Sequence, residues 1–309
     1  TVGDIPLDEF TLDHAEFVIS QPTLKDGSVR HVSQCMSRLF KLAVTPARIL
    51  EQSPFPPGWL PLAEEPKDGE FLWPAEDALL LGCRSVPLVF RLFYGFSMRE
   101  GPRKGNVQML RREELHLSLP GGQGAIVVRK TKTTGAAMWK LDMGTAEALR
   151  RWLRLHDSPW VFPAKMVPRY RRQRMGQSVE ARHLAAKLRE HLELAGVTRP
   201  GLFEATDDSM RMRLHDLRAT FVTLALARGK SHTWIKRRTQ HGGDAMIRRY
   251  NHAAGALREL TMGNLAPMHE AIPELAEMAP SAEWLDRERS PKGRQPDPEG
   301  FDDEEDEDE

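Results

Sequence analysis

The segment HDLRATFVTLALARGKSHTWIKRRTQHGGDAMIRRYNH, residues 215–252, contains the most informative pattern in this sequence. His215 and Arg218 are three residues apart, so on a helix they share one face. His241 follows Arg218 by 23 residues, and Tyr250 follows His241 by nine. The residues on both sides of Tyr250 are charged or polar, which disfavours a dry core position for its ring. We interpret these four side chains as parts of one functional site.

Helical periodicity dominates the rest of the sequence. Apolar residues recur at helical spacing in 28–52, 78–81 with 86–96, 145–155, 179–195, 215–228 and 231–239, and the last four of these ranges look amphipathic. Residues 124–141 instead alternate and are rich in β-branched side chains, which favours a strand or a hairpin. The sequence therefore predicts a mainly α fold with a small β-sheet or hairpin.

Composition divides the chain into parts. Residues 53–75 are rich in Pro and Gly and are expected to form a linker. We expect a short helical unit, 1–52, before this linker and a larger unit, 76–265, after it. Residues 266–309 form an acidic C-terminal segment. From about residue 286 this segment is too polar to bury much apolar surface, so it is expected to be disordered.

The formal net charge of zero hides an asymmetry. Residues 1–265 hold 40 basic and 28 acidic side chains, a net charge of +12, whereas residues 266–309 hold four basic and sixteen acidic ones, a net charge of −12. A basic body is typical of a nucleic-acid binder, and the alternative is an ordinary protein with a solubilising end. No apolar run approaches the about 18–20 residues of a membrane span. The two cysteines lack metal-ligand spacing, which fits a reducing, cytoplasmic setting.

The segment quoted above resembles the C-terminal signature of the tyrosine recombinases, the family that includes the phage integrases. That signature has a His-x-x-Arg, then a histidine in a Gly-His pair, then a nucleophilic tyrosine, and the spacings in this sequence match it. The resemblance implies that His215, Arg218, His241 and Tyr250 are catalytic. One position departs from the pattern, because Gln240 stands where the family usually has glycine.

The family also has an upstream arginine, in a Gly-x-Arg followed seven residues later by leucine. Gly101, Arg103 and Leu110 fit this pattern, so the resemblance implies that Arg103 is the first catalytic arginine. Asn106 stands where the family usually has glutamate. This second departure affects how Arg103 is supported, but it removes no reacting group.

A catalytic lysine completes the family's site and lies in a β-hairpin. Within the predicted hairpin, Lys132 fits the family pattern best and Lys130 is the alternative. The resemblance extends over most of residues 28–260. It implies that 1–52 is part of a helical core-binding domain and that 76–265 is the catalytic domain, which breaks and rejoins DNA.

The chemistry of phosphodiester cleavage explains these residue types. Negative charge grows on a pentacoordinate phosphorus, and guanidinium groups can hold its oxygens in a fork while staying charged. The histidines add donors and can transfer protons near neutral pH. The resemblance implies a 3′-phosphotyrosyl intermediate at Tyr250, with Lys132 protonating the departing 5′-oxygen. The covalent link retains the bond energy, so neither ATP nor another cofactor is expected, and the sequence has no metal motif.

Double-stranded DNA is the expected partner. Two basic clusters are candidate contacts to the DNA backbone, the first with Arg169, Arg171 and Arg172 and the second with Lys236 and Arg237. The resemblance implies a homotetramer on paired DNA sites, with residues 255–278 as a candidate for docking on a neighbouring subunit. No membrane association is expected, and in a bacterium the protein would be associated with the nucleoid.

Two other functions remain open at this stage. One is a tyrosine-type topoisomerase that relaxes DNA as a monomer. The other is a DNA-binding regulator without catalysis, which the departures at Asn106 and Gln240 allow. For the acidic end, an autoinhibitory role that mimics DNA is a further hypothesis beside simple solubilisation.

Overall fold

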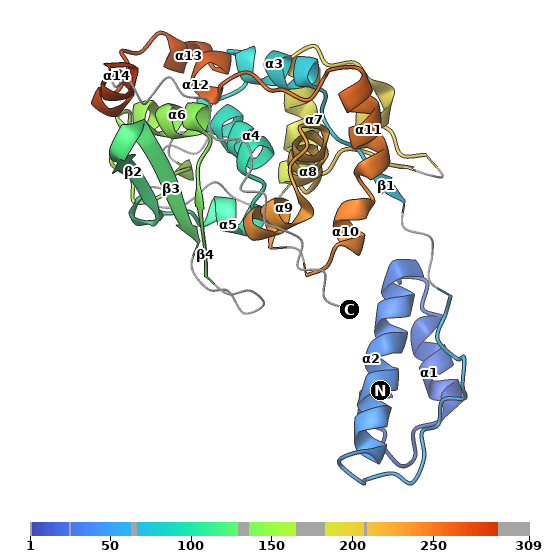
Figure 1. Ribbon diagram of the computed structural model, residues 1–309. Helices are drawn as coiled ribbons and strands as arrows, with labels where there is room; N and C mark the ends of the chain where they lie inside the picture. Colours follow the sequence, from blue (N-terminus) through green and yellow to red (C-terminus); the bar gives the residue numbers. More distant parts are fainter. Residues whose placement is uncertain are drawn as a thin grey trace, which may run out of the picture. The chain divides into compact units, whose positions relative to one another are not determined.

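The computed structural model of this chain describes residues 2–24, 26–62, 67–128, 136–164, 183–206, 209–240 and 242–289. The chain splits into two compact units, Thr1–Pro66 and Lys67–Glu309 (Figure 1). The division falls within the segment that the sequence suggests as a linker. The domain boundaries given above remain predictions.

The first unit is a pair of helices closed by aromatic rings. It contains η1 (Val2–Asp4), α1 (Leu12–Ile19) and α2 (Asp26–Val44). The ring of Phe40 on α2 lies 5.0 Å from that of Phe10 and 5.0 Å from that of Phe55, measured between centroids. The helix expected over 28–52 ends at Val44 because Pro46 disfavours helical geometry in the residue before it.

Two buried helices form the centre of the second unit. They are α4 (Leu88–Glu100) and α8 (Asp216–Ala227), which contact each other. All but the first residue of α4 and every residue of α8 are buried. The expectation that 215–228 is amphipathic was therefore wrong. A helix that is apolar on most sides is enclosed by its neighbours, and α8 is covered by α4, α9 and α11.

A small antiparallel sheet packs beside these helices. Its order is β2 (Leu115–Leu119), β3 (Gln123–Val128) and β4 (Ala137–Lys140). In its register Ile126 pairs with Trp139, and both side chains enter the main core. Helix α6 (Met143–Leu153) contacts β3 (Figure 1). The prediction of a mainly α fold with a small sheet is confirmed.

The remaining elements of the second unit surround this centre. A parallel pair, β1 (Asp68–Gly69) with β5 (Ser209–Met210), lies outside the sheet. The other elements are α3 (Pro74–Gly82), α5 (Lys104–Gln108), η2 (Arg112–Glu114), η3 (Pro120–Gly122), α7 (Leu184–Leu194), η6 (Pro200–Leu202), α9 (His232–Thr239), α10 (Ala245–Arg248), α11 (Asn251–Glu259), α12 (Met268–Ala271), α13 (Pro273–Ala276) and α14 (Ala282–Arg289). None of the described helices is long and apolar enough to cross a membrane.

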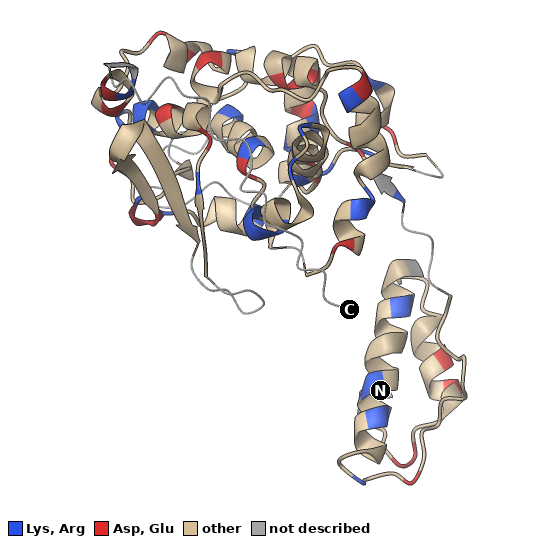
Figure 2. Cartoon of the chain, viewed as in Figure 1, with Lys and Arg blue, Asp and Glu red and all other residues tan. Residues whose placement is uncertain are grey.

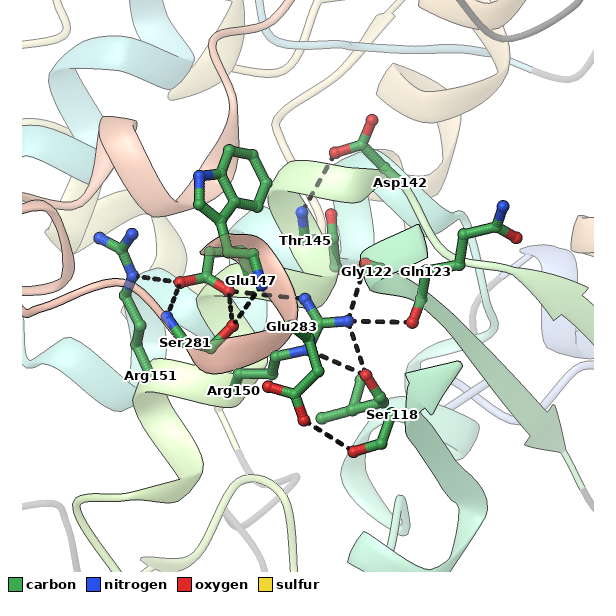
Figure 3. Close-up of polar contacts among 12 residues, drawn as sticks. Ser118, Gly122, Gln123, Asp142, Thr145, Glu147, Arg150, Arg151, Ser281 and Glu283 are labelled. Carbon is green, nitrogen blue, oxygen red and sulfur yellow. Dashed lines mark hydrogen bonds and ion pairs between the residues drawn. The ribbon is translucent and has the colours of Figure 1, made fainter. Parts of the chain in front are cut away.

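The described part of the C-terminal segment, residues 266–289, packs on the core of its own chain. Met268, Ile272 and Leu275 are fully buried in the main core. Ser281 provides a second attachment. Its backbone N–H and its hydroxyl donate hydrogen bonds to the buried carboxylate of Glu147 on α6, at 2.9 Å and 2.5 Å (Figure 3). These contacts fix the start of α14, which continues past residue 286, where the sequence suggests the onset of disorder.

Ion pairs add to this attachment. Nε of Arg151 lies 2.7 Å from Glu147. Arg150 donates to the backbone oxygens of Gly122, which ends η3, and of Gln123, which begins β3 (Figure 3). A buried charge without a partner would cost several kcal/mol, whereas here each one is paired and hydrogen-bonded. The result is a rigid connection among α6, the sheet and α14.

Candidate active site

The turn after α4 positions the first arginine. Helix α4 is capped at its C-terminal end by Gly101, whose φ of 70° places it in the left-handed region. A Cβ atom at this position would lie 2.2 Å from Cδ1 of Phe221 on α8, which no side chain can occupy. Glycine is therefore required on two counts, conformation and space. The turn brings Arg103 close to the N-terminal half of α8.

Arg218 connects this turn to the end of α9. The residue is 4% exposed, and its Nη1 donates to the backbone oxygen of Gly101 at 2.8 Å. Its Nη2 donates to the backbone oxygen of Thr239. Within the described part of the chain, its buried Nε has no hydrogen-bond partner. A buried donor without a hydrogen-bond partner destabilises the folded chain. An anionic oxygen that accepts a hydrogen bond from this Nε would therefore be bound favourably.

The electrostatics of Arg218 indicate which groups lie near it. Burial, and to a smaller extent the positive charge of Arg103, lowers the pKa of this guanidinium to about 9, although Tyr250 acts in the opposite direction. The two arginines therefore repel each other, and the phenol of Tyr250 lies near Arg218. An anion placed between them would relieve this repulsion.

Arg103 is held by the residue that departs from the family pattern. Its Nη2 donates to the backbone oxygen of Gln240 at 3.0 Å, and its Nη1 donates to Oε1 of the same residue at 3.3 Å. Gln240 ends α9 with φ 54° and ψ 41°, the left-handed conformation that glycine adopts easily. The backbone geometry expected of a glycine is therefore kept, at a cost of about 1–2 kcal/mol. The amide side chain of Gln240, which a glycine would lack, contacts Arg103.

His215 and Tyr250 complete the group. His215 lies at the N-terminal end of α8, where partial burial and the charges of Arg218, Arg213 and Arg103 lower its pKa and favour the neutral imidazole. Tyr250 is half-buried between α10 and α11. It packs against the second core cluster, a group of buried residues that includes Phe221, Ile235 and Leu257. Burial raises the pKa of its phenol above the ordinary value. The nearby arginines, with Arg249 first, act in the opposite direction.

Sequence reasoning missed Arg213, which also lies near the phenol. Its side chain forms an ion pair with Asp216, Nη2 to Oδ1 at 2.9 Å, and that carboxylate also accepts from the backbone N–H of Arg213 at 2.7 Å. Hydrogen bonding to Asp216 raises the pKa of Arg213, and the charge of Tyr250 adds to this effect. The only feature of the sequence that could have indicated this position near the phenol is that Arg213 stands two residues before His215.

Glu100 is a second residue that the sequence did not reveal. It is fully buried and accepts hydrogen bonds from Nε1 of Trp139 at 3.0 Å and from the backbone N–H of Asp142 at 2.9 Å. It also forms an ion pair of 3.2 Å with Arg238 on α9. One carboxylate therefore joins the turn before Arg103, strand β4 and the helix that ends at Gln240.

The burial of Glu100 predicts a pH-dependent contribution to stability. Burial raises its pKa to about 7, although Arg238 lowers it. Between about pH 4.5 and pH 7 the folded chain keeps a proton that the unfolded chain has released, so the free energy of unfolding falls as pH rises. Between pH 5 and pH 8 the free energy of unfolding of the wild type, compared with that of Glu100→Gln, should fall by about 2–3 kcal/mol. Urea unfolding at both pH values measures this difference.

The control for this experiment is Glu113→Gln, because Glu113 is an exposed glutamate in η2. The free energy of unfolding of this variant should differ from that of the wild type by the same amount at pH 5 and at pH 8. A constant difference for Glu100→Gln would contradict the prediction.

A model of the phage integrase family matches residues 77–256, more than half of the chain. The chain belongs to the phage integrase family. The matched range begins in α3 and ends in α11, so it contains Arg103, His215, Arg218 and Tyr250. No significant match was found among curated protein sequences.

Solved structures of two integrases and of a site-specific recombinase share this fold. A λ integrase dimer bound to a COC′ core site has a TM-score of 0.57 at 13% identity, covering 80% of this chain and 66% of that one. XerH recombinase in a pre-cleavage complex with difH has a TM-score of 0.55 at 16% identity, covering 80% and 68%. The Tn1549 transposon integrase with circular intermediate DNA has a TM-score of 0.57 at 16% identity, covering 82% and 87%. The present chain spans just under two thirds of the λ integrase chain.

Some predicted site residues of this integrase-family chain lie outside the described residues. They are Lys130, Lys132, Arg169, Arg171, Arg172 and His241. Lys236 is described on α9, where its Nζ forms an ion pair of 3.0 Å with Asp244, and Arg237 is exposed on the same helix. The DNA contacts assigned to these residues remain predictions.

Proposed function

We propose that this chain is a site-specific DNA recombinase that cleaves and rejoins double-stranded DNA through Tyr250. The observation that supports this proposal is that Arg218 interacts electrostatically with Arg103, His215 and Tyr250. These residues come from segments that are far apart in the sequence. Membership of the phage integrase family supports the same conclusion.

In this proposal the two guanidiniums of Arg103 and Arg218 bind the non-bridging oxygens of the scissile phosphate. The unpartnered Nε of Arg218 supplies one donor for them. Groups held in advance for a developing charge usually provide the largest catalytic effect. The neutral imidazole of His215 can accept a proton in this setting, which the raised pKa of Tyr250 makes necessary for attack.

The reaction then has two balanced steps. The oxygen of Tyr250 attacks phosphorus, the bond to the 5′-oxygen breaks, and Lys132, or Lys130 in its place, donates a proton to that oxygen. A 5′-hydroxyl from the same or another strand later attacks the phosphotyrosine and releases the phenol. No ATP is consumed, because the phosphotyrosyl bond retains the energy of the broken one. His241 is proposed as a further donor to the phosphate.

Double-stranded DNA is the proposed partner, with a homotetramer on two paired sites as the working assembly. The +12 body, residues 1–265, would supply phosphate contacts and make binding strongly dependent on salt. Solved structures of λ integrase contain a dimer bound to a COC′ core site and a tetramer bound to a Holliday junction, which supports this assembly.

A nicked suicide substrate tests the proposal. When cleavage releases a short oligonucleotide, rejoining is prevented and the covalent complex accumulates. We expect an adduct without metal or ATP that resists denaturation and maps to Tyr250 by peptide mass analysis. DNA binding without an adduct on any duplex would favour the regulator instead. An adduct with relaxation of supercoils but no strand exchange between two marked duplexes would favour the topoisomerase.

A further inference from the structure

A cavity lined by cations lies beside the candidate active site. Its volume is about 1030 Å³. Its walls come from β4, the start of α6, the loop after α8, helix α9, residues 264–267 and α14. Figure 2 shows basic residues on β4, α9 and α14. The lining contains six cationic side chains and one carboxylate, that of Asp142: the cations are Arg99, Lys140, Arg228, Lys230, Arg238 and Arg287.

Several of these cations are held in place by neighbouring groups. The guanidinium of Arg238 lies 4.0 Å from the ring centre of Trp234 and is also bound by Glu100. Nζ of Lys230 lies 5.7 Å from the same ring. Arg287 lies 5.3 Å from the ring centre of Trp284. Cations that are already fixed lose little freedom when they bind an anion, so this cavity is suited to a multiply charged anionic ligand.

Its size limits what that ligand can be. A cavity of this volume is in the range that encloses a small molecule or a few side chains, not a DNA duplex. Asp142 caps α6 by accepting from the backbone N–H of Thr145 at 3.1 Å (Figure 3). Its negative charge acts on Arg228, but one carboxylate offsets only part of the charge of the six lining cations. The fitting occupant is therefore a single chain with closely spaced negative charges.

This chain contains such a segment. Residues 302–309, DDEEDEDE, are eight consecutive carboxylates. They follow α14, and Trp284 and Arg287 of that helix line the cavity. The twelve residues 290–301 between them can span up to about 40 Å when extended. A short tether of this kind raises the effective concentration of the segment at the cavity.

We propose that the acidic segment 302–309 binds in this cation-lined cavity of its own chain. The cavity shares helix α9 with the candidate active site. Arg238 is in the cavity wall, and the next two residues, Thr239 and Gln240, accept hydrogen bonds from Arg218 and Arg103. An occupant that competes with Glu100 for Arg238 therefore acts on the helix end that supports both arginines. The binding itself does not require that the chain cleave DNA.

Zero-length carbodiimide cross-linking of the full chain tests this proposal. The reagent joins a lysine amine to a carboxylate only when the two are in contact. Lys140 and Lys230 line the cavity, whereas Lys104 and Lys187 do not and serve as internal references. We expect cross-links from 302–309 to the cavity lysines to exceed those to the references at least about tenfold. They should be lost when salt is raised from about 0.05 M to 0.5 M.

Matched variants make the result decisive. Replacing the eight acids by their amides keeps the length and shape of the segment, and it should remove these cross-links. Equal labelling of cavity and reference lysines would overturn the proposal. Cross-links between copies labelled with different isotopes would identify a neighbour's segment as the occupant, which also overturns it. If Lys230→Gln with Arg287→Gln weakens DNA binding equally in the wild type and in the amide variant, the cavity serves DNA instead.

Discussion

Replacing Tyr250 by phenylalanine is expected to reduce strand cleavage on a suicide substrate by at least about 10⁴-fold. The substitution removes the nucleophilic oxygen, and no other group can form the same ester. The ring itself remains, so its packing against the second core cluster is kept. DNA affinity and the temperature of unfolding should therefore change little. The rate of covalent complex formation measures the effect, with filter binding and thermal unfolding beside it.

The control is Tyr94→Phe, which deletes the same oxygen from the main core. The hydroxyl of Tyr94 lies 3.0 Å from Nδ1 of His191, so this variant should lose stability and keep its cleavage rate. Cleavage at the wild-type rate by Tyr250→Phe would show that the phenol is structural.

Replacing Arg218 by lysine is expected to reduce the cleavage rate by about 10²–10³-fold, although the positive charge is retained. Lysine lacks the planar fork and cannot donate to a phosphate while it also bonds the backbone oxygens of Gly101 and Thr239. The loss should appear in the single-turnover rate more than in DNA affinity. Single-turnover cleavage with saturating protein separates the two quantities.

Arg189→Lys is the matched control. Arg189 also donates to a backbone oxygen, that of Met212 at 2.7 Å, but it takes no part in the candidate site. Its cleavage rate should stay within a few-fold of the wild type after correction for stability. If Arg218→Lys behaves in the same way, the guanidinium has no special role in catalysis.

The sequence alone determined the local structure and the chemical type of the site. Helical periodicity located seven of the fourteen described α-helices, α2 to α4 and α6 to α9, although α2 ends eight residues earlier than predicted. Alternation located β3 and β4, because both patterns depend on neighbours along the chain. The offsets among His215, Arg218, His241 and Tyr250 identified the family, which the family model confirms. Their catalytic roles remain predictions.

Only the tertiary structure shows which neighbouring residues hold the candidate site residues in place. Glu100 looks like an ordinary helix-end residue, and its burial depends on Trp139 and Arg238, both far away in the sequence. The left-handed backbone of Gln240 and its contact with Arg103 likewise join residues 137 positions apart.

The same is true of the C-terminal segment, which sequence patterns could not assign to its own chain or to a neighbour. In the structure its described residues, 266–289, pack on the core of their own chain through Met268 and Leu275. The physical reason is common to all these cases. Burial, and with it the pKa of a carboxylate or the partner of an arginine, depends on segments that meet only when the chain has folded.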